Sequence, residues 1–203
     1  MKIGDIAEVI VGVVPTRKRA NYKTDKTNQY ELFNLRTYES RQNEDKIPYE
    51  EFISEEDLSS YVVRKDDLLL RLAFPLKVII VDDELDGKLI TNQYVSIRMD
   101  VTKYNPGFLK WYLESNDLRH QLEKYIVGTA IRTIPVVKIR EILLPNVDIN
   151  TQEELGKLVR CWEAQKKRYN YLIAQKELYY NSIIETIINE KEDKNYEWKT
   201  ITR

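Results

Sequence analysis

Two carboxylates and a lysine in the first half of the chain have the residue types used by metal-dependent nucleases. Asp67 is followed, some distance on, by Asp86-Gly87-Lys88. In such enzymes two carboxylates hold Mg²⁺ and a lysine stabilises the phosphorane that forms during cleavage. Asp86-Gly87 is also an ordinary hairpin turn between two strands. Metal-dependent cleavage by Asp67, Asp86 and Lys88 therefore stands as an alternative to a structural role.

The other residues that could catalyse a reaction stand alone. His120 is the only histidine and Cys161 the only cysteine, so the chain cannot form an internal disulfide or a four-ligand Cys/His metal site. We interpret His120 as a solvated helix residue and Cys161 as a packing residue. The six glycines are scattered singly and form no phosphate-binding loop. We expect no catalytic residue, metal or cofactor in this chain, and a reducing, cytoplasmic location.

Basic side chains gather in two stretches that lack acidic residues, at residues 9–24 and 124–140. The whole chain is near neutral, with 32 basic and 33 acidic side chains, so its composition alone does not predict a nucleic-acid-binding protein. An uneven charge distribution can still produce one basic face. Such side chains contact phosphates and base edges, although a solvated loop has a similar composition. The candidate DNA-contacting residues are Arg17, Lys18, Arg19, Asn21, Thr129, Arg132 and Lys138.

Short apolar runs separated by turn residues predict a mixed α/β domain over residues 1–147, and an α+β fold class. Residues 36–46 are polar and predict a loop. Residues 50–58 predict a short helix with Ser54 as its N-cap, and residues 108–123 predict a single helix. A helical turn and a strand open the chain, and the later predicted strands are residues 30–35, 67–72, 77–81 and 89–99.

Residues 148–191 predict a long helical spacer, in which apolar residues recur at alternating steps of three and four. Gln165 and Lys176 interrupt this heptad pattern. The helix is roughly 60 Å long, more than a compact domain of this size needs. It could pack on its own domain, but pairing with another long helix fits the pattern better. Residues 192–203 are charged and predict a poorly ordered tail. The expected contact residues are Leu155, Leu158, Trp162, Tyr169, Leu172, Tyr179 and Ile183.

The order of several phrases resembles the specificity (S) subunits of type I restriction–modification enzymes. Asp67-Leu68-Leu69-Leu70-Arg71 is similar to the family's Asp-Ile-Leu-hydrophobic-x-Arg phrase. The most specific part is Gly128-Thr129-Ala130-Ile131-Arg132-Thr133-Ile134, followed by Ile142-Leu143-Leu144-Pro145, Gln152-Glu153 and the long helix. In the family this order marks the end of a target-recognition domain and the entry to a spacer helix. Similar stretches also occur at residues 2–12 and 106–113.

The chain departs from the family pattern in three places. Ala73-Phe74-Pro75 stands where a glycine often follows the arginine that corresponds to Arg71. Asn146-Val147-Asp148 replaces the usual proline-rich exit from the domain. Most S subunits carry two recognition domains and two spacers, whereas this chain has one of each, and residues 196–201 are similar to the phrase that opens a recognition domain. The resemblance is therefore to a half-length S subunit.

The resemblance implies a non-catalytic DNA-recognition subunit that directs adenine methylation by a partner. That partner is the methyltransferase (modification) subunit, which carries S-adenosylmethionine, and a restriction subunit can join the complex. A wide apolar stripe favours a symmetric homodimer with antiparallel spacer helices, which would read a bipartite palindromic site in double-stranded DNA. No apolar run is long enough to cross a membrane. A third possibility is a coiled-coil adaptor that never meets DNA.

Overall fold

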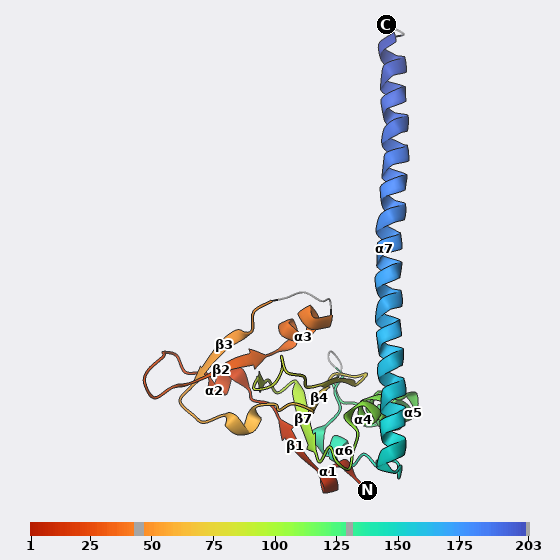
Figure 1. Ribbon diagram of the computed structural model, residues 1–203. Coiled ribbons are helices and arrows are strands. Elements are labelled where there is room, and N and C mark those ends of the chain that lie inside the picture. Colours follow the sequence, from red (N-terminus) through yellow and green to blue (C-terminus); the bar gives the residue numbers. More distant parts are fainter. Residues whose placement is uncertain (43–46, 129–131, 202–203) are drawn as a thin grey trace. The chain divides into compact units, whose positions relative to one another are not determined.

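The computed structural model describes residues 1–42, 47–128 and 132–201, with side chains for all of these except Gln42 and residues 190–201. It divides into two units, Met1–Lys157 and Leu158–Arg203, which we call the N-terminal unit and the helical unit. The chain combines short strands and helices with one long helix, α7 (Ile149–Ile201) (Figure 1). The predicted α+β fold class with a long C-terminal helix is thus confirmed.

A four-stranded antiparallel sheet forms the centre of the N-terminal unit, in the order β1-β7-β4-β5. In β4 three consecutive leucines are buried, because this strand has protein on both of its faces. Leu68 and Leu70 face one core and Leu69 faces another. The strands are β1 (Ala7–Val11), β4 (Leu68–Arg71), β5 (Lys77–Ile80) and β7 (Tyr94–Met99).

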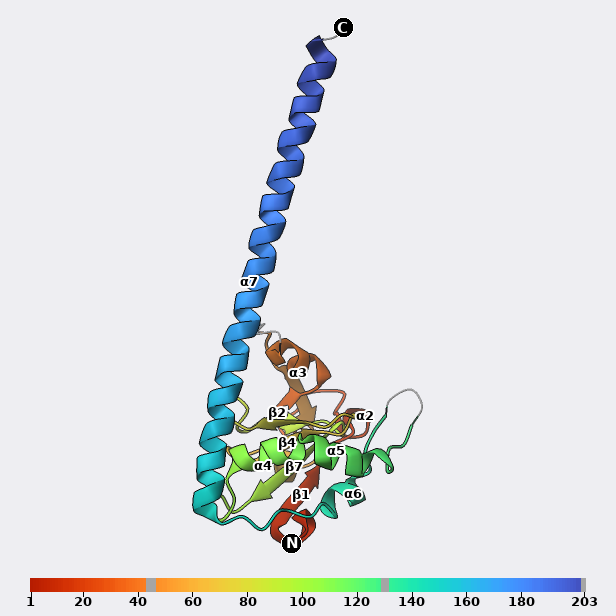
Figure 2. The ribbon, with the colours of Figure 1, turned by 90° about the vertical axis from the view of Figure 1, so that its right-hand side faces the viewer.

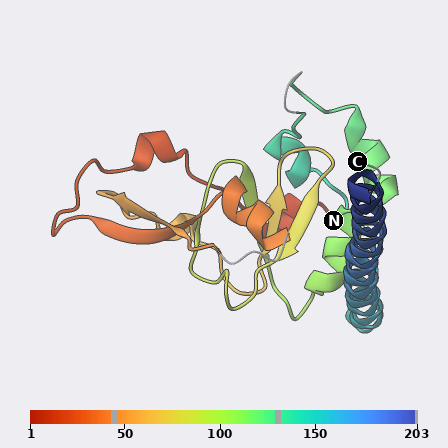
Figure 3. The ribbon, with the colours of Figure 1, turned by 90° about the horizontal axis from the view of Figure 1, so that it is seen from above.

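A smaller three-stranded sheet has the order β3-β2-β6. Strand β2 (Asn28–Phe33) pairs antiparallel with β3 (Glu50–Ser54) and parallel with β6 (Leu89–Ile90). Figure 3 shows β2 and β3, in orange, as an antiparallel pair that extends away from the yellow strands β4 and β5. The chain passes between the two sheets at Gly12, whose N–H donates to the carbonyl of Tyr94 at 3.1 Å.

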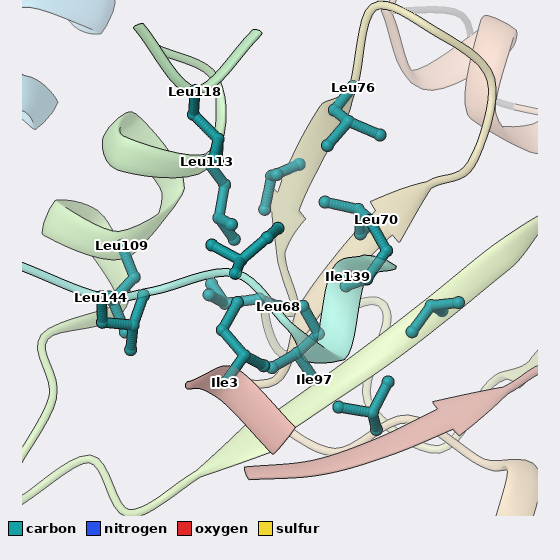
Figure 4. Close-up of a cluster of buried hydrophobic side chains, with 14 of the residues drawn as sticks. Ile3, Leu68, Leu70, Leu76, Ile97, Leu109, Leu113, Leu118, Ile139 and Leu144 are labelled. Carbon is teal, nitrogen blue, oxygen red and sulfur yellow. The ribbon is translucent and has the colours of Figure 1, made fainter. Parts of the chain in front are cut away.

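Helices cover one face of the four-stranded sheet. Helices α4 (Pro106–Leu113) and α5 (Asn116–Glu123) lie along it (Figure 2) and bury their apolar residues there. Short helices α1 (Ile3–Ile6) and α6 (Val136–Arg140) complete the same core. Figure 4 shows these side chains converging from the sheet and the helices. The other elements are α2 (Pro15–Lys18), α3 (Leu35–Gln42) and the 3₁₀ turn η1 (Ser59–Tyr61).

The first turns of α7 belong to the N-terminal unit. Asp148 caps the helix, since its Oδ1 accepts a hydrogen bond from the Thr151 N–H at 3.1 Å. The buried Gln152 accepts from the Asn105 N–H at 3.0 Å and donates to the carbonyl of Val147 at 2.8 Å. The compact N-terminal unit therefore includes the first turns of α7, up to Lys157.

Two predictions in the middle of the N-terminal unit are wrong. The segment predicted as a loop contains helix α3, in which Tyr38 alone supplies a large buried apolar side chain, so no periodic pattern marks the helix. The segment predicted as a short helix contains β3, where Phe52 is fully buried and its glutamate neighbours are exposed. Ser54 accepts a hydrogen bond from the Glu56 N–H within a turn instead of capping a helix.

Three predicted boundaries also differ. The single helix predicted at residues 108–123 is α4 and α5, because Ser115 starts a new helix by accepting from the Leu118 N–H. The strand predicted at residues 89–99 is β6 and β7, which belong to different sheets. Helix α7 continues to Ile201, past the predicted end near residue 191, since no proline or glycine follows Gly156 in it; residues 202–203 of the predicted tail lie outside the described residues.

Replacing Gly12 by alanine should destabilise the N-terminal unit by about 2–3 kcal/mol, because the new methyl group would overpack against backbone. Its Cβ would lie 2.3 Å from the carbonyl oxygen of Thr91 and 2.5 Å from that of Ile90. Urea unfolding measures this change. Gly87→Asn is the control, because Gly87 has a positive φ but nothing within 4 Å of a Cβ there, and asparagine tolerates that conformation. Equal loss of stability in both variants would contradict the steric argument.

Candidate nucleic-acid interface

The first basic stretch lies against the three-stranded sheet. Helix α2 begins with Pro15 in its first turn. The segment after it is hydrogen-bonded to β3, because the Ala20 N–H donates to the Ile53 carbonyl at 2.9 Å. Arg17 and Asn21 are exposed on this segment. In the part of the chain that the structure describes, Arg17 has no carboxylate within ion-pair distance.

The other basic residues of this stretch are paired with the acidic strand β3 and the turn after it. Lys18 forms an ion pair with Glu56, and Arg19 forms one with Glu50. The Arg19 guanidinium also lies 4.7 Å from the centroid of the Phe52 ring. The charges of Lys18 and Arg19 are therefore largely offset within the protein, and both side chains help hold the segment to the sheet.

The second basic stretch adjoins the four-stranded sheet. The Phe74 N–H donates to the carbonyl of Arg132 at 2.8 Å, and Thr133 and Val127 exchange two backbone hydrogen bonds. Arg132 is exposed. Lys138 lies 2.7 Å from Glu141, and this hydrogen bond raises the pKa of the lysine ammonium. Thr129, the remaining candidate, lies outside the described residues.

The two stretches thus belong to different sheets. Arg17 and Asn21 lie on a segment that is hydrogen-bonded to β3. Arg132 lies on a segment that is hydrogen-bonded to the chain just after β4, and Lys138 lies on α6. Among all these residues, Arg17, Asn21 and Arg132 combine exposure with the absence of a carboxylate partner in the described residues. The sequence showed the basic composition of both stretches but not which charges were offset.

The residues of the alternative metal site have structural partners. Asp67 is 3 % exposed, and its carboxylate accepts hydrogen bonds from Arg98 Nε at 3.0 Å and Nη2 at 2.8 Å. It also accepts from Ser96 Oγ at 2.9 Å. The hydrogen bond with Asp67 raises the pKa of the Arg98 guanidinium. A carboxylate bound in this way by a guanidinium has little capacity left for a cation.

Asp86 and Lys88 are engaged separately from Asp67. Asp86 accepts a hydrogen bond from the Lys65 N–H at 3.0 Å, and Lys88 pairs with Glu31 and lies over the Tyr49 ring. Among the described residues no group of three or more His, Cys, Asp and Glu side chains could hold a metal ion. This geometry gives no support to the nuclease alternative.

The helical unit carries a wide exposed apolar face. Trp162 is 60 % exposed and Leu172 is 50 % exposed. Leu155 differs from the other predicted contact residues, because it belongs to the N-terminal unit and packs against the core there. Tyr171 and Leu178 are also exposed on this unit and are not among the predicted contact residues. The predicted contact residues exposed on this unit are Leu158, Trp162, Tyr169, Leu172, Tyr179 and Ile183.

Comparison with solved structures relates the chain to one group of proteins. A chain of a type I R-M system, solved to explain complex assembly and conformational transition, matches at a TM-score of 0.56 and 18% identity, over 83% of this chain and 42% of that chain. The HsdS subunit of Thermoanaerobacter tengcongensis matches at 0.51 and 15%, over 81% and 37%. The type I S subunit of M. genitalium gives 0.49 and 11%, over 83% and 39%.

The chain has the fold of type I restriction–modification S (HsdS) subunits. It spans about two fifths of the length of the chains that it matches. No protein-family model matches the sequence, and no curated protein matches it either. The resemblance read from the sequence is therefore confirmed at the level of the fold.

Two residues of the motifs that carry the resemblance, Asp67 and Gln152, form hydrogen bonds between elements of the fold. Asp67 opens the phrase that becomes β4, and its carboxylate is bonded to the neighbouring strand β7 through Ser96 and Arg98. Gln152 anchors the start of α7. Both residues hold neighbouring elements of the structure together.

Among the described helices, none is both long enough and sufficiently apolar to span a lipid bilayer.

Replacing Asp67 by alanine should lower the free energy of unfolding by roughly 3–5 kcal/mol, because Arg98 would be left partly buried without its carboxylate. Urea or thermal unfolding measures the loss. The control is Asp83→Asn, an exposed carboxylate paired with Lys65, which should change stability little. The nuclease alternative would instead be favoured if the wild-type chain cleaved plasmid DNA with Mg²⁺ and the Asp67 variant lost this cleavage while keeping its stability.

Proposed function

We propose that the chain is the DNA-recognition (specificity) subunit of a type I restriction–modification complex. The observation that supports this most is the HsdS fold, shared over more than four fifths of the chain. The N-terminal unit reads a short run of base pairs in double-stranded DNA. The subunit directs adenine methylation by a partner, and cleavage where a restriction subunit joins the complex.

In this proposal the chain carries no catalytic group of its own. The methyltransferase (modification) subunit holds S-adenosylmethionine and transfers the methyl group. The alternative of a metal-dependent nuclease is weakened by the Asp67–Arg98 pair. The alternative of a coiled-coil adaptor that never meets DNA shares the helical unit but leaves the HsdS-like N-terminal unit without a role.

We propose that two copies associate through the helical unit, with the helices antiparallel. Burying a large apolar side chain stabilises an association by about 1.5–3 kcal/mol. Trp162, Tyr169, Leu172 and Tyr179 are all more than a third exposed, so this stabilisation is not obtained within one chain. A twofold axis between two copies would present two identical readers, and the target would be a bipartite palindrome.

A second face of the helix suits the modification subunit. Tyr171 lies nine residues after Trp162, which is two and a half helical turns, so it points to the opposite side. Leu178 lies seven residues further along and therefore shares the face of Tyr171. Their exposed fractions are 66 % and 64 %. A second helix packed on Trp162 would leave this face open to a different subunit.

We assign DNA contact to the exposed residues whose charge or polarity is not already taken up within the protein. These are Arg17 and Asn21 on the three-stranded sheet and Arg132 beside the four-stranded sheet. Lys18 and Arg19 hold the first segment in place through Glu56 and Glu50. Of these three, Arg17 and Asn21 are of the types that read base edges bidentately in the major groove.

The double substitution Trp162→Glu with Leu172→Glu should convert the homodimer to a monomer, because two charges would enter the apolar contact between the helices. Sedimentation equilibrium measures the mass. The matched control is Tyr171→Glu with Leu178→Glu, which adds the same charges on the opposite face. We expect this control to remain a dimer and to lose the modification subunit in co-purification. A dimer of unchanged mass in the first variant would reject the proposed contact face.

The assembled chain and modification subunit should methylate adenines in one interrupted palindromic sequence, and single-molecule sequencing of methylated DNA measures this. Mapping before and after deletion of the gene for this chain provides the control. An asymmetric or continuous motif would contradict the twofold homodimer but keep the recognition role. Methylation that does not depend on this chain would reject the proposed function.

A further inference from the structure

Two aromatic rings of the N-terminal unit each form cation–π contacts with two basic side chains. The guanidinium groups of Arg119 and Arg132 lie 5.5 and 5.3 Å from the centroid of the Phe74 ring. The two cations come from different segments, since Arg119 belongs to α5 and Arg132 lies beyond the end of that helix. An aromatic face attracts a cation electrostatically and restrains its orientation.

The second ring repeats the arrangement. The ammonium groups of Lys124 and Lys138 lie 5.0 and 4.6 Å from the centroid of the Tyr125 ring. Lys138 comes from α6, and Lys124 is the C-cap of α5. We call Arg119, Lys124, Arg132 and Lys138 the four-cation cluster.

Backbone hydrogen bonds join the segments that contain the two rings. The Val127 and Thr133 N–H groups each donate to the other residue's carbonyl, at 3.0 and 2.9 Å. Tyr125 lies two residues before this pair, and Arg132 directly precedes it on the returning chain. Phe74 is attached to the same chain, because its N–H donates to the Arg132 carbonyl. The segments that hold the two rings, and with them the four cations, are therefore linked by backbone hydrogen bonds.

The cluster keeps a net positive charge. Arg119 Nε is 3.8 Å from a carboxylate oxygen of Glu123, and Lys138 is 2.7 Å from one of Glu141, so these two charges are shared. Lys124 and Arg132 have no carboxylate within 4 Å in the residues that the structure describes. Two positive charges thus remain available for a ligand, unlike those of Lys18 and Arg19.

We infer that the four-cation cluster binds the phosphate backbone of the DNA duplex next to the bases that the N-terminal unit reads. This inference rests on the proposed function. A guanidinium or ammonium held over a ring still has N–H groups to donate to phosphate oxygens. Such contacts fix the position of a protein on DNA and carry no sequence information. The cluster is a positioning surface, and discrimination between bases lies elsewhere.

The test measures binding by the chain assembled with its modification subunit to two fluorescent duplexes, one with the mapped target and one scrambled. The variant is Lys124→Gln with Arg132→Gln, titrated at several salt concentrations. Each lost phosphate contact lowers the slope of log affinity against log salt by about 0.9, so we expect a reduction of roughly 2. The affinity for both duplexes should fall by the same factor.

The control is Lys65→Gln with Lys103→Gln, which removes two charges that face carboxylates on the surface, and its salt slope should equal that of the wild type. The charge-preserving variant Lys124→Arg with Arg132→Lys should keep the slope, which separates loss of charge from damage to the fold. An unchanged slope in the Gln variant, or a loss confined to the target duplex, would overturn the inference. If the wild-type complex binds neither duplex, the proposed function fails as well.

Discussion

The apolar face of the helical unit is the constraint on which the organisation of this chain depends. A single helix cannot cover its own side chains, and Trp162, Leu172 and Ile183 remain exposed along one face. Burial of such residues drives most protein association. Tyr171 and Leu178 are exposed on the other side, so one partner helix would not cover all the apolar surface. The helical unit thus leaves apolar side chains exposed on both of these faces.

The N-terminal unit differs, because it buries most of its large apolar residues within itself. Strand β4 is the centre of this packing, with Leu68 and Leu70 in one core and Leu69 in the other. The ion pair of Asp67 with Arg98 joins the start of this strand to β7. An interior of this kind leaves the loops around the sheets free to carry function. The two units therefore differ in where their apolar residues lie, which are mostly buried in the N-terminal unit and mostly exposed on the helical unit.

Features that follow from local sequence were predictable, and features that follow from long-range contacts were not. The heptad pattern predicts α7, and consecutive leucines predict β4. Helix α3 was missed because its burial depends on Tyr38 meeting Tyr94, a contact across the fold. The pairing of Lys18 with Glu56 likewise joins residues 38 positions apart. For the same reason the sequence predicted two basic stretches but could not separate neutralised cations from available ones.

The difference between neutralised and available cations also shows how a nearly neutral chain can have positive charge available for phosphate. Glu56 and Glu50 form ion pairs with Lys18 and Arg19, and these pairs hold the first basic segment against the three-stranded sheet. Among the described residues, Lys124 and Arg132 are instead restrained by the aromatic faces of Tyr125 and Phe74, which do not cancel their charge. Net charge averages over both arrangements. What matters for phosphate binding is therefore which kind of group holds each cation, and only the folded structure shows this.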